Sequence, residues 1–277
     1  MKVGFVTGAN KGIGFALVER LVKFYGPSGE WDIYLTARDV GRGQKACEEL
    51  KAKGLEVKFH QLDITNPTSR KTFLDYMCAN YPTGINLAVN NAGVYFGFDR
   101  TMPRGKKAQI TIGTNFTCTI DFTMEFLPLL APDARIVNVS SMDSIMCLTG
   151  LSNELYNKFM GPMDLETLRL LIDQFVEYAQ KGVESKYGWY SCPYGVSKAA
   201  LTKASFILGE MLKSDPRRIV INSCCPGWVP TDLSGHMGSG TPDDGADTPF
   251  FLATLPVGVK EPVNEYVTGR KIKKWCR

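Results

Sequence analysis

Short runs of apolar and β-branched residues alternate along the chain with longer segments in which apolar residues recur at helical spacing. Several short runs are continuously apolar, which is typical of strands that helices cover on both faces. The predicted strands are Val3–Val6, Ile33–Thr36, Val57–Leu62, Ile85–Val89, Arg135–Val139 and Ile219–Cys224, with a candidate seventh at Glu265–Val267. The predicted helices between them are Gly12–Phe24, Arg42–Lys53, Ser69–Asn80, Gln109–Leu130 and Ser191–Leu212.

This alternation, with short connections, predicts an α/β fold in which helices pack on both faces of a parallel sheet of about seven strands. The 277 residues contain no internal repeat and no low-complexity linker. We therefore predict that residues 1–277 form a single domain with a Rossmann-like, doubly wound sheet.

Two stretches interrupt the alternation. Between Ser141 and Tyr194 no segment has strand character, and apolar residues at helical spacing begin after Asp164 and end before Gly182. Asp is a favoured N-cap and Gly a favoured C-terminal stop, so we predict an amphipathic helix within an insertion over about residues 145–190. The second stretch, about residues 226–247, is rich in Gly, Pro, Ser, Thr and Asp, which predicts a mobile loop over a site.

The composition is that of an ordinary globular protein, with 44% hydrophobic and 22% charged residues. A net charge of +4, with one small basic cluster near the C-terminus, does not favour binding to nucleic acid or to a membrane. No apolar stretch is long enough for a membrane span and no secretion signal is recognisable, so we expect a cytoplasmic protein. The eight cysteines form no Cys-x-x-Cys pair, which predicts reduced thiols and no metal site.

The first predicted strand runs into a glycine-rich turn, Thr7-Gly8-Ala9-Asn10-Lys11-Gly12-Ile13-Gly14, and then into a helix. Without Cβ atoms in the way, the backbone there can approach a pyrophosphate at the N-terminus of the helix. The spacing Gly-x-x-x-Gly-x-Gly alone would also fit an ordinary tight turn. Its place directly after the first strand favours a dinucleotide site that includes Gly8, Asn10, Lys11, Gly12, Ile13 and Gly14.

Arg38 and Arg42 follow the second predicted strand, where a site for NAD usually has an acidic residue for the ribose hydroxyls. Together with Lys11 they would place three cations around a 2′-phosphate, which predicts NADPH rather than NADH. The alternative is that both arginines are solvated surface residues, and the neighbouring Asp39 leaves that alternative open.

Polar groups suited to catalysis follow the other predicted strands. Tyr194 and Lys198 are four residues apart on a predicted helix and share a face, so the ammonium is expected to lower the pKa of the phenol. The carboxyl ends of parallel strands face one crevice, so further polar groups are expected to meet the glycine-rich turn there. These groups are Ser140 and Ser141 after the fifth strand, Asn90-Asn91-Ala92-Gly93 after the fourth, and Asn115 in the next helix.

Together these motifs resemble those of the short-chain dehydrogenase/reductase family over essentially the whole chain. The matching motifs are Thr7–Gly14, Asn90–Gly93, Asn115, Ser141, Tyr194 with Lys198, and Pro226-Gly227. The resemblance implies a catalytic tetrad in which Tyr194 donates a proton to the carbonyl oxygen and Ser141 hydrogen-bonds that oxygen. It implies that Lys198 holds the nicotinamide ribose and that Asn115 anchors a water of the proton relay. Further implied cofactor contacts are Asp63, Ile64, Asn90, Ala92, Gly93, Pro226, Gly227, Val229 and Thr231.

More closely, the chain looks like the monomeric NADPH-dependent carbonyl reductases. The similarity lies in the long insertion before Tyr194 and in five short stretches. In these relatives the insertion packs where other members of the family form their oligomer interface, so the resemblance implies a monomer. The five stretches are Thr7–Gly14, Leu35–Val40, Phe59–Asp63, Cys224–Val229 and Gly245–Pro249.

The same resemblance places Trp228 and Cys225 on the substrate side, with Met142 and Leu233 near them. An indole beside an apolar wall suits flat aromatic or quinonoid carbonyl compounds. Trp228 could equally be a packed loop residue and Cys225 a small buried hydrophobe, and nothing in the sequence shows whether Cys225 is reactive. Asp143 stands where such a reductase would have an apolar residue; it either makes the pocket wall acidic or turns into solvent.

The expected function is therefore NADPH-dependent reduction of ketone, aldehyde or quinone carbonyls on small-molecule substrates. One alternative is a narrow secondary-alcohol or ketone dehydrogenase of specialised metabolism, because some such enzymes share the insertion. Another is a non-catalytic NADPH-binding sensor, which the presence of all four tetrad residues disfavours. A serine hydrolase is disfavoured because the chain has only two histidines and no Gly-x-Ser-x-Gly motif, which leaves no plausible base for a serine nucleophile.

Overall fold

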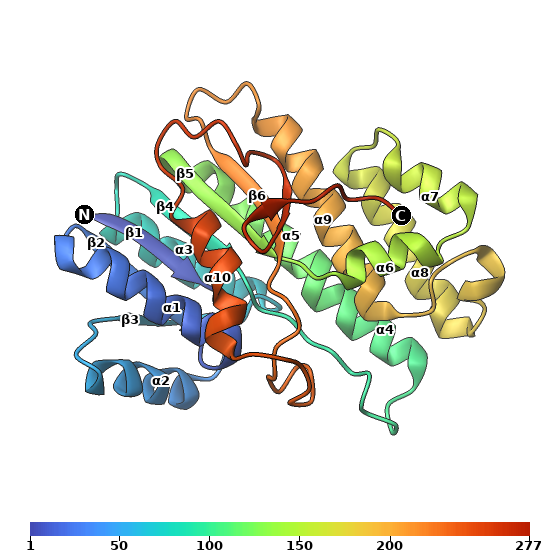
Figure 1. Cartoon of the computed structure of the whole chain (residues 1–277), viewed down its shortest axis with the longest axis horizontal. Coiled ribbons are helices and arrows are strands. Elements are labelled where there is room, and N and C mark those ends of the chain that lie inside the picture. Colours follow the sequence, from blue (N-terminus) through green and yellow to red (C-terminus); the bar gives the residue numbers. More distant parts are fainter.

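An eight-stranded sheet forms the centre of the protein, and helices cover both of its faces (Figure 1). The computed structural model describes residues 1–277. The strand order is β3-β2-β1-β4-β5-β6-β7-β8, and all neighbours are parallel except the antiparallel pair β7 and β8. The strands are β1 (Lys2–Val6), β2 (Trp31–Ala37), β3 (Lys58–Gln61), β4 (Ile85–Asn90), β5 (Leu130–Val139), β6 (Val220–Cys225), β7 (Tyr266–Thr268) and β8 (Lys271–Ile272).

This order confirms the predicted doubly wound sheet. The chain moves outward from β1 to β3 and then returns to add β4 on the other side of β1, so the topological switch lies between β1 and β4. In open α/β sheets, ligands bind in the crevice at such a switch, beyond the carboxyl ends of the strands. The helices are α1 (Gly12–Tyr25), α2 (Val40–Ala52), α3 (Pro67–Asn80), α4 (Arg104–Ile112), α5 (Thr119–Phe126), α6 (Asp143–Gly150), α7 (Asn153–Met160), α8 (Leu165–Lys181), α9 (Pro193–Leu212) and α10 (Pro242–Ala253).

Strand β1 illustrates how the sequence produces two helical layers. Val3 and Phe5 belong to the apolar cluster formed with α3, α4, α5 and α9, whereas Val6 belongs to the cluster formed with α1, α2 and α10. Because successive side chains of a strand point to opposite faces, a strand covered on both sides needs apolar residues at every position. This requirement explains the continuously apolar runs in the sequence.

The predicted helix Gln109–Leu130 differs from the structure. Helix α4 already begins at Arg104, a π-helical turn follows over Gly113–Cys118, and α5 ends in a 3₁₀ turn at Leu127–Leu129. Strand β5 then begins at Leu130, five residues before the predicted start at Arg135. The apolar pattern continues across these boundaries, and Pro128, which has no backbone N–H to donate, lies in the turn that ends the helix.

The insertion before Tyr194 contains α6, α7 and α8 and no strand. The predicted amphipathic helix is confirmed as α8, whose N-terminus is capped by Asp164 (2.8 Å to the Thr167 N–H) and whose C-terminus ends at Gly182 with φ +68°. Its apolar face, with Leu168, Ile172 and Phe175 fully buried, packs against α4 and α9. Figure 1 shows α7 and α8 at the side of the molecule away from β1 to β3.

The loop predicted over about residues 226–247 is shorter in the structure. Helix α10 begins at Pro242, because Thr241 and Asp244 form a reciprocal capping box that starts the helix there. The remaining segment between β6 and α10 contains no regular helix or strand. None of the helices combines the length and the apolar character that a membrane crossing requires.

Candidate active site

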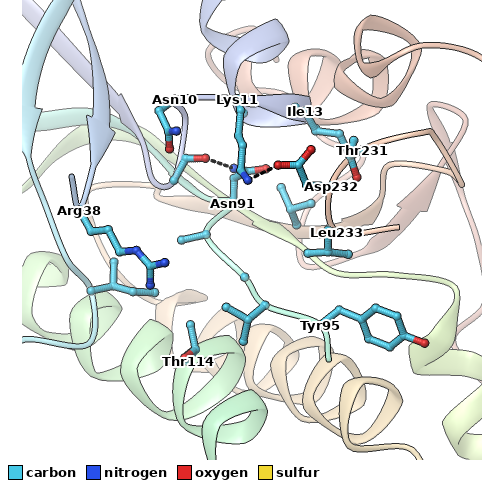
Figure 2. A pocket seen from close by; sticks show the side chains of 18 of the residues that line it. Asn10, Lys11, Ile13, Arg38, Asn91, Tyr95, Thr114, Thr231, Asp232 and Leu233 are labelled. Atoms are coloured by element: carbon cyan, nitrogen blue, oxygen red, sulfur yellow. Dashed lines mark hydrogen bonds and ion pairs between the residues drawn. The ribbon is translucent and has the colours of Figure 1, made fainter. Parts of the chain in front are cut away.

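A pocket of about 580 Å³ lies at the carboxyl ends of the strands, at the predicted crevice (Figure 2). The loops after β1, β2, β3, β4, β5 and β6 all contribute to its wall, together with the start of α9. The structure therefore brings the predicted cofactor and catalytic ends of the site into one cavity. Predicted site residues that line it are Gly8, Asn10, Lys11, Gly12, Ile13, Gly14, Arg38, Arg42, Asp63, Ile64, Ala92, Gly93, Tyr194, Lys198, Pro226, Thr231 and Leu233.

The glycines after β1 are required by space and by backbone conformation. A Cβ atom on Gly14 would lie 2.5 Å from Nδ2 of Asn91, and one on Gly8 would lie 2.9 Å from the Cα of Ala92. Gly8 and Gly12 also have positive φ angles, +62° and +59°. No side chain caps the N-terminus of α1, so its first N–H groups stay free to bind an anion.

Thr7 and Asn91 belong to two of the motifs quoted from the sequence, and they hold the glycine-rich turn in place. The Thr7 hydroxyl accepts hydrogen bonds from the backbone N–H groups of Asn91 (3.0 Å) and Ala92 (2.9 Å). In return, Nδ2 of Asn91 donates to the carbonyl oxygens of Thr7 (2.8 Å) and Gly8 (3.2 Å). These bonds join the loops after β1 and β4 across the topological switch. The two motifs were expected to meet at this crevice, but the individual hydrogen bonds could not be predicted from the sequence.

Asn90, which was expected to contact the cofactor, does not line the pocket. It is buried, and its Nδ2 donates to the hydroxyl of Thr123 (2.9 Å) and to Oδ1 of Asn138 (2.8 Å). It ends strand β4, whose side chains alternate between the faces of the sheet. Asn90 therefore connects β4 to α5 and β5, and its neighbour Asn91 faces the pocket instead.

Arg38 and Arg42 line one end of the pocket, beyond β2. The structure also explains the acidic residue between them, because Asp39 caps α2 by accepting a hydrogen bond from the Arg42 N–H (2.8 Å). Its other oxygen lies 3.5 Å from the guanidinium of Arg42. Arg38 has no ion-pair partner in the protein. Asp39 also lines the pocket, but one of its oxygens is engaged as the helix cap and the other faces Arg42, so Arg38 is the unpaired charge at this end.

The side chain of Lys11 does not point toward the two arginines, so the prediction that the three cations surround one phosphate is not met in this structure. Its ammonium forms an ion pair with Asp232 in the loop after β6, and Figure 2 shows it directed toward Asp232 while Arg38 lies on the other side of the pocket. The imidazole of His236 lies 3.3 Å from the same carboxylate. The sequence could not reveal this contact, because Lys11 and Asp232 are far apart along the chain. The ion pair links the glycine-rich turn to the loop that covers the pocket.

Tyr194 and Lys198 line the pocket, whereas Ser141 does not line it but follows the pocket-lining Ser140 and is hydrogen-bonded to Tyr194. Lys198 lies one turn after Tyr194 on α9, with its Nζ 5.6 Å from the centre of the phenol ring. That Nζ donates to the carbonyl oxygen of Val139 (2.7 Å) at the end of β5. The Ser141 hydroxyl interacts with the hydroxyl of Tyr194 and also accepts from the Asp143 N–H (3.1 Å). Ser140 has a structural role, since its hydroxyl bonds Thr202 (2.6 Å).

The pKa of Tyr194 is shifted in the direction opposite to the prediction. Burial of the phenol raises its pKa above the ordinary value, and the nearby carboxylate of Asp143 raises it further, while the hydrogen bond from Ser141 lowers it. Burial also lowers the pKa of the Lys198 ammonium to about 8. The predicted lowering of the phenol pKa by Lys198 is therefore wrong for this structure, because desolvation dominates both groups.

Asn115 lies in the π-helical turn and is completely buried. Its Oδ1 accepts from the Val94 N–H (2.8 Å), and its Nδ2 donates to the Val94 carbonyl (2.9 Å) and to the Ser197 hydroxyl (3.1 Å). The side chain thus joins the loop after β4 to α9 and has no exposed polar atom for a water. π-helical turns are frequent at functional sites. A role of Asn115 in anchoring a water of the proton relay stays a prediction.

Of the four residues expected on the substrate side, only one lines the pocket. Leu233 lines the pocket, and Met142 is half-buried against the core. Cys225 is buried, and its Sγ accepts hydrogen bonds from the N–H groups of Met142 (3.2 Å) and Gly227 (3.3 Å). Burial raises the pKa of this thiol, which disfavours a reactive thiolate. Trp228 is 66% exposed and does not line the pocket. Contact of Trp228 and Cys225 with a substrate stays a prediction.

Val229 and Gly227 do not line the pocket either. Val229 is buried and packs near Gly245 of α10, and Gly227 takes a positive φ of +85° in the turn after β6. Two aromatic residues that the sequence did not single out, Tyr95 and Phe96, form part of the wall beyond β4. Only the fold shows that the loop after Gly93 reaches the catalytic end.

Comparison with known proteins agrees with this arrangement. Residues 2–153 match the family model described as short chain dehydrogenase. The chain is 43% identical to "Carbonyl reductase [NADPH] 1" of Rattus norvegicus, over 99% of this chain and 98% of that protein. It is 42% identical to the Homo sapiens protein of the same name, with the same coverage. The chain belongs to the short-chain dehydrogenase family.

Solved structures also share the fold over nearly the full length. Salutaridine reductase from Papaver somniferum superposes with a TM-score of 0.83 at 25% identity, covering 96% of this chain and 99% of that one. Menthone neomenthol reductase from Mentha piperita gives a TM-score of 0.78 at 26% identity, with coverage of 96% and 98%.

Proposed function

We propose that the protein reduces ketone, aldehyde or quinone carbonyls with NADPH. The observation that carries this proposal is one pocket in which a glycine-lined phosphate cradle and Arg38 lie at one end and Tyr194 and Lys198 lie at the other, with Ser141 hydrogen-bonded to Tyr194. Relatives that are 42–43% identical over nearly the whole chain are named as NADPH carbonyl reductases, which supports the same reaction here.

The donor groups of the pocket fit a dinucleotide phosphate. The cradle at Gly8 and Gly14 has no room for a Cβ atom, and the uncapped N-terminus of α1 can donate to the pyrophosphate. Arg38, with Arg42 beside it, would bind the 2′-phosphate of NADPH through charge-assisted hydrogen bonds. Lys11 could add to this charge only by giving up its ion pair with Asp232.

In the proposed mechanism the reduced nicotinamide, when bound, supplies the hydride for the carbonyl carbon. Ser141 donates a hydrogen bond to the carbonyl oxygen and orients it, and Tyr194 donates its phenolic proton to that oxygen as it becomes an alkoxide. Lys198 keeps a positive charge beside the phenol and binds the ribose. Asn115 fixes the loop after β4 and α9 relative to each other.

The protonation state of Tyr194 suits its role as the proton donor in carbonyl reduction. A pKa raised above the ordinary value of about 10 keeps the phenol protonated at neutral pH, and a protonated phenol is the form that can donate. Alcohol oxidation needs the phenolate as base, which burial and the Asp143 carboxylate both disfavour.

The experiment that tests the proposal follows oxidation of NADPH at 340 nm near neutral pH, with each substrate repeated with NADH. The panel contains an ortho-quinone, an aromatic aldehyde and a cyclic terpenoid ketone. We expect turnover of the quinone and the aldehyde with NADPH and much weaker turnover with NADH. Turnover of only the terpenoid ketone would instead support a narrow ketone dehydrogenase. Binding of NADPH without any turnover would support a cofactor sensor.

We further propose a monomer that acts in the cytoplasm. Helix α8 of the insertion packs against α4 and α9 and covers their apolar faces, which removes a surface that a partner subunit could otherwise use. Analytical ultracentrifugation should give the mass of a single chain across a wide concentration range. A stable dimer or tetramer would contradict this part of the proposal. The single-domain organisation of residues 1–277 predicts one cooperative unfolding transition in the same preparation.

A further inference from the structure

Asp143 occupies an unusual position between the catalytic side chains. It is the first residue of α6, and its N–H donates to the Ser141 hydroxyl (3.1 Å). Its carbonyl oxygen lies against the start of α9, where a Cβ atom on Gly195 would be 3.2 Å away. The backbone of Asp143 therefore contacts the proton-donating region from two sides, through Ser141 and through the neighbour of Tyr194.

The carboxylate of Asp143 has no partner in the protein. The side chain is half-buried, yet it accepts no hydrogen bond and forms no ion pair. Other acids that are withdrawn from solvent, such as Glu184 and Asp121, face an arginine. The cation whose charge acts on Asp143 is Lys198, and its ammonium donates a hydrogen bond to the Val139 carbonyl instead. Burial raises the pKa of Asp143 from its ordinary value, which agrees with a carboxylate that lacks compensation.

Aromatic rings surround the same place. The Tyr95 ring meets the Tyr194 ring edge to face, with centroids 5.1 Å apart. The ring of Tyr190 packs on the other side, 3.0 Å from a Cβ atom built on Gly195. The charge of Asp143 raises the pKa of all three phenols, so its carboxylate lies within electrostatic reach of each ring. Tyr95 and Tyr194 line the pocket, as Figure 2 shows for Tyr95, and Asp143 lies next to that lining, three residues after the pocket-lining Ser140.

An unpaired carboxylate within electrostatic reach of several aromatic rings is a combination that can bind an organic cation. The rings attract a cation through their quadrupoles, and the carboxylate supplies the counter-charge. We propose that Asp143 is the counter-ion for a positively charged group on the substrate, so that the preferred substrates are carbonyl compounds bearing a protonated or quaternary amine. This inference rests on the proposed carbonyl reductase function and specifies the substrate class of the same site.

The test compares two aldehydes of almost equal size that differ in charge. The cationic one is 4-(trimethylammoniomethyl)benzaldehyde, and the neutral one is 4-neopentylbenzaldehyde; the methylene in both insulates the carbonyl from the substituent. The measured quantity is the ratio of kcat/KM for the cationic aldehyde to that for the neutral one. Both substrates use the same proton donor, so a change in the pKa of Tyr194 cancels in this ratio.

We expect the ratio to favour the cation in the wild-type protein and to fall at least about tenfold in Asp143→Asn. Asp143→Glu keeps the charge and should keep most of the preference. The control is Asp75→Asn, which removes an exposed charge that is paired with Lys71 on α3 and should leave the ratio unchanged. Binding of NADPH to each variant, measured by fluorescence, shows that it is folded.

Equal ratios in the wild type and in Asp143→Asn would overturn this inference while leaving the proposed function intact, provided that the neutral aldehyde is reduced. If no carbonyl compound is reduced at all, the proposed function itself fails. Should Asp143→Asn not fold, benzyltrimethylammonium is tested against the neutral aldehyde with the wild-type protein. Competitive inhibition, absent with uncharged benzyl alcohol at the same concentration, supports the inference, and no inhibition overturns it.

Discussion

Arg38 is the residue on which the cofactor preference depends. Its guanidinium lines the pocket without an ion-pair partner, whereas Lys11 is paired with Asp232 and Asp39 is used as a helix cap. Arg38→Ala should raise KM for NADPH about tenfold to a hundredfold, because a charge-assisted hydrogen bond is worth about 1.5–3 kcal/mol. KM for NADH should change little, since NADH has no 2′-phosphate.

Steady-state kinetics with both cofactors checks this prediction. Lys71→Ala, which removes an exposed positive charge from α3, serves as the matched control. Equal effects of Arg38→Ala on NADPH and NADH would show that Arg38 does not bind the 2′-phosphate.

Lys198 should control the alkaline limb of the pH profile. Burial lowers the pKa of its ammonium to about 8, so the positive charge is present below about pH 8 and is lost as the pH rises through this value. Tyr194 does not titrate there, because its pKa is raised. We therefore expect kcat/KM for reduction to be steady near neutral pH and to fall above about pH 8. A profile that stays flat to pH 10 would contradict this assignment.

At the scale of elements, the glycine-rich turn and α1 depend on close backbone packing. Gly14→Ala would place a Cβ atom 2.5 Å from Nδ2 of Asn91 and 2.9 Å from the Cα of Ala9. We expect a loss of about 1–3 kcal/mol of folding free energy, together with weaker NADPH binding. Gly113→Ala is the control, because nothing lies within 4 Å of its Cβ and its backbone is helical.

Thermal unfolding and fluorescence titration of NADPH measure both effects of Gly14→Ala. If this variant is as stable as the wild type and binds NADPH as tightly, the cradle does not have the tight geometry described above.

The order of strands and helices could be predicted because each run of apolar residues must be covered on both faces. Local periodicity therefore identified α8 with both of its caps, as well as most of the strands. It failed at the helix expected over Gln109–Leu130, where the apolar pattern continues from α5 through Pro128 into β5. It also missed the two-residue strand β8, which is too short to have a periodicity of its own.

The candidate site was predictable where a motif had a fixed place after a strand. Gly8, Gly14, Arg38, Tyr194 and Lys198 all line the pocket. The contacts that modify their chemistry join distant segments, and these could not be predicted. The ion pair of Lys11 with Asp232 is one case, and the Asn91 bonds to the turn after β1 are another. The pKa of Tyr194 was predicted in the wrong direction, because burial cannot be read from the spacing of Tyr and Lys.

For the molecule as a whole, two halves of the sheet make different contributions to one pocket. The loops after β1, β2 and β3 supply the phosphate cradle and Arg38, while the end of β5 and the start of α9 supply the reacting groups, and the loops after β4 and β6 complete the wall. The order of the strands brings both sets together at the switch between β1 and β4. Helix α8 of the insertion packs on other helices and not on the sheet, so it changes the surface of the molecule without altering the sheet.

The most direct test of this account is turnover of an ortho-quinone and an aromatic aldehyde with NADPH by Tyr194→Phe, beside the wild type. Loss of the proton donor should lower kcat for the aldehyde by at least about a hundredfold, while the Kd of NADPH stays nearly unchanged. Tyr187→Phe, at an exposed tyrosine outside the pocket, should retain full activity. Near-normal aldehyde reduction by Tyr194→Phe would contradict the assignment of Tyr194 as the proton donor.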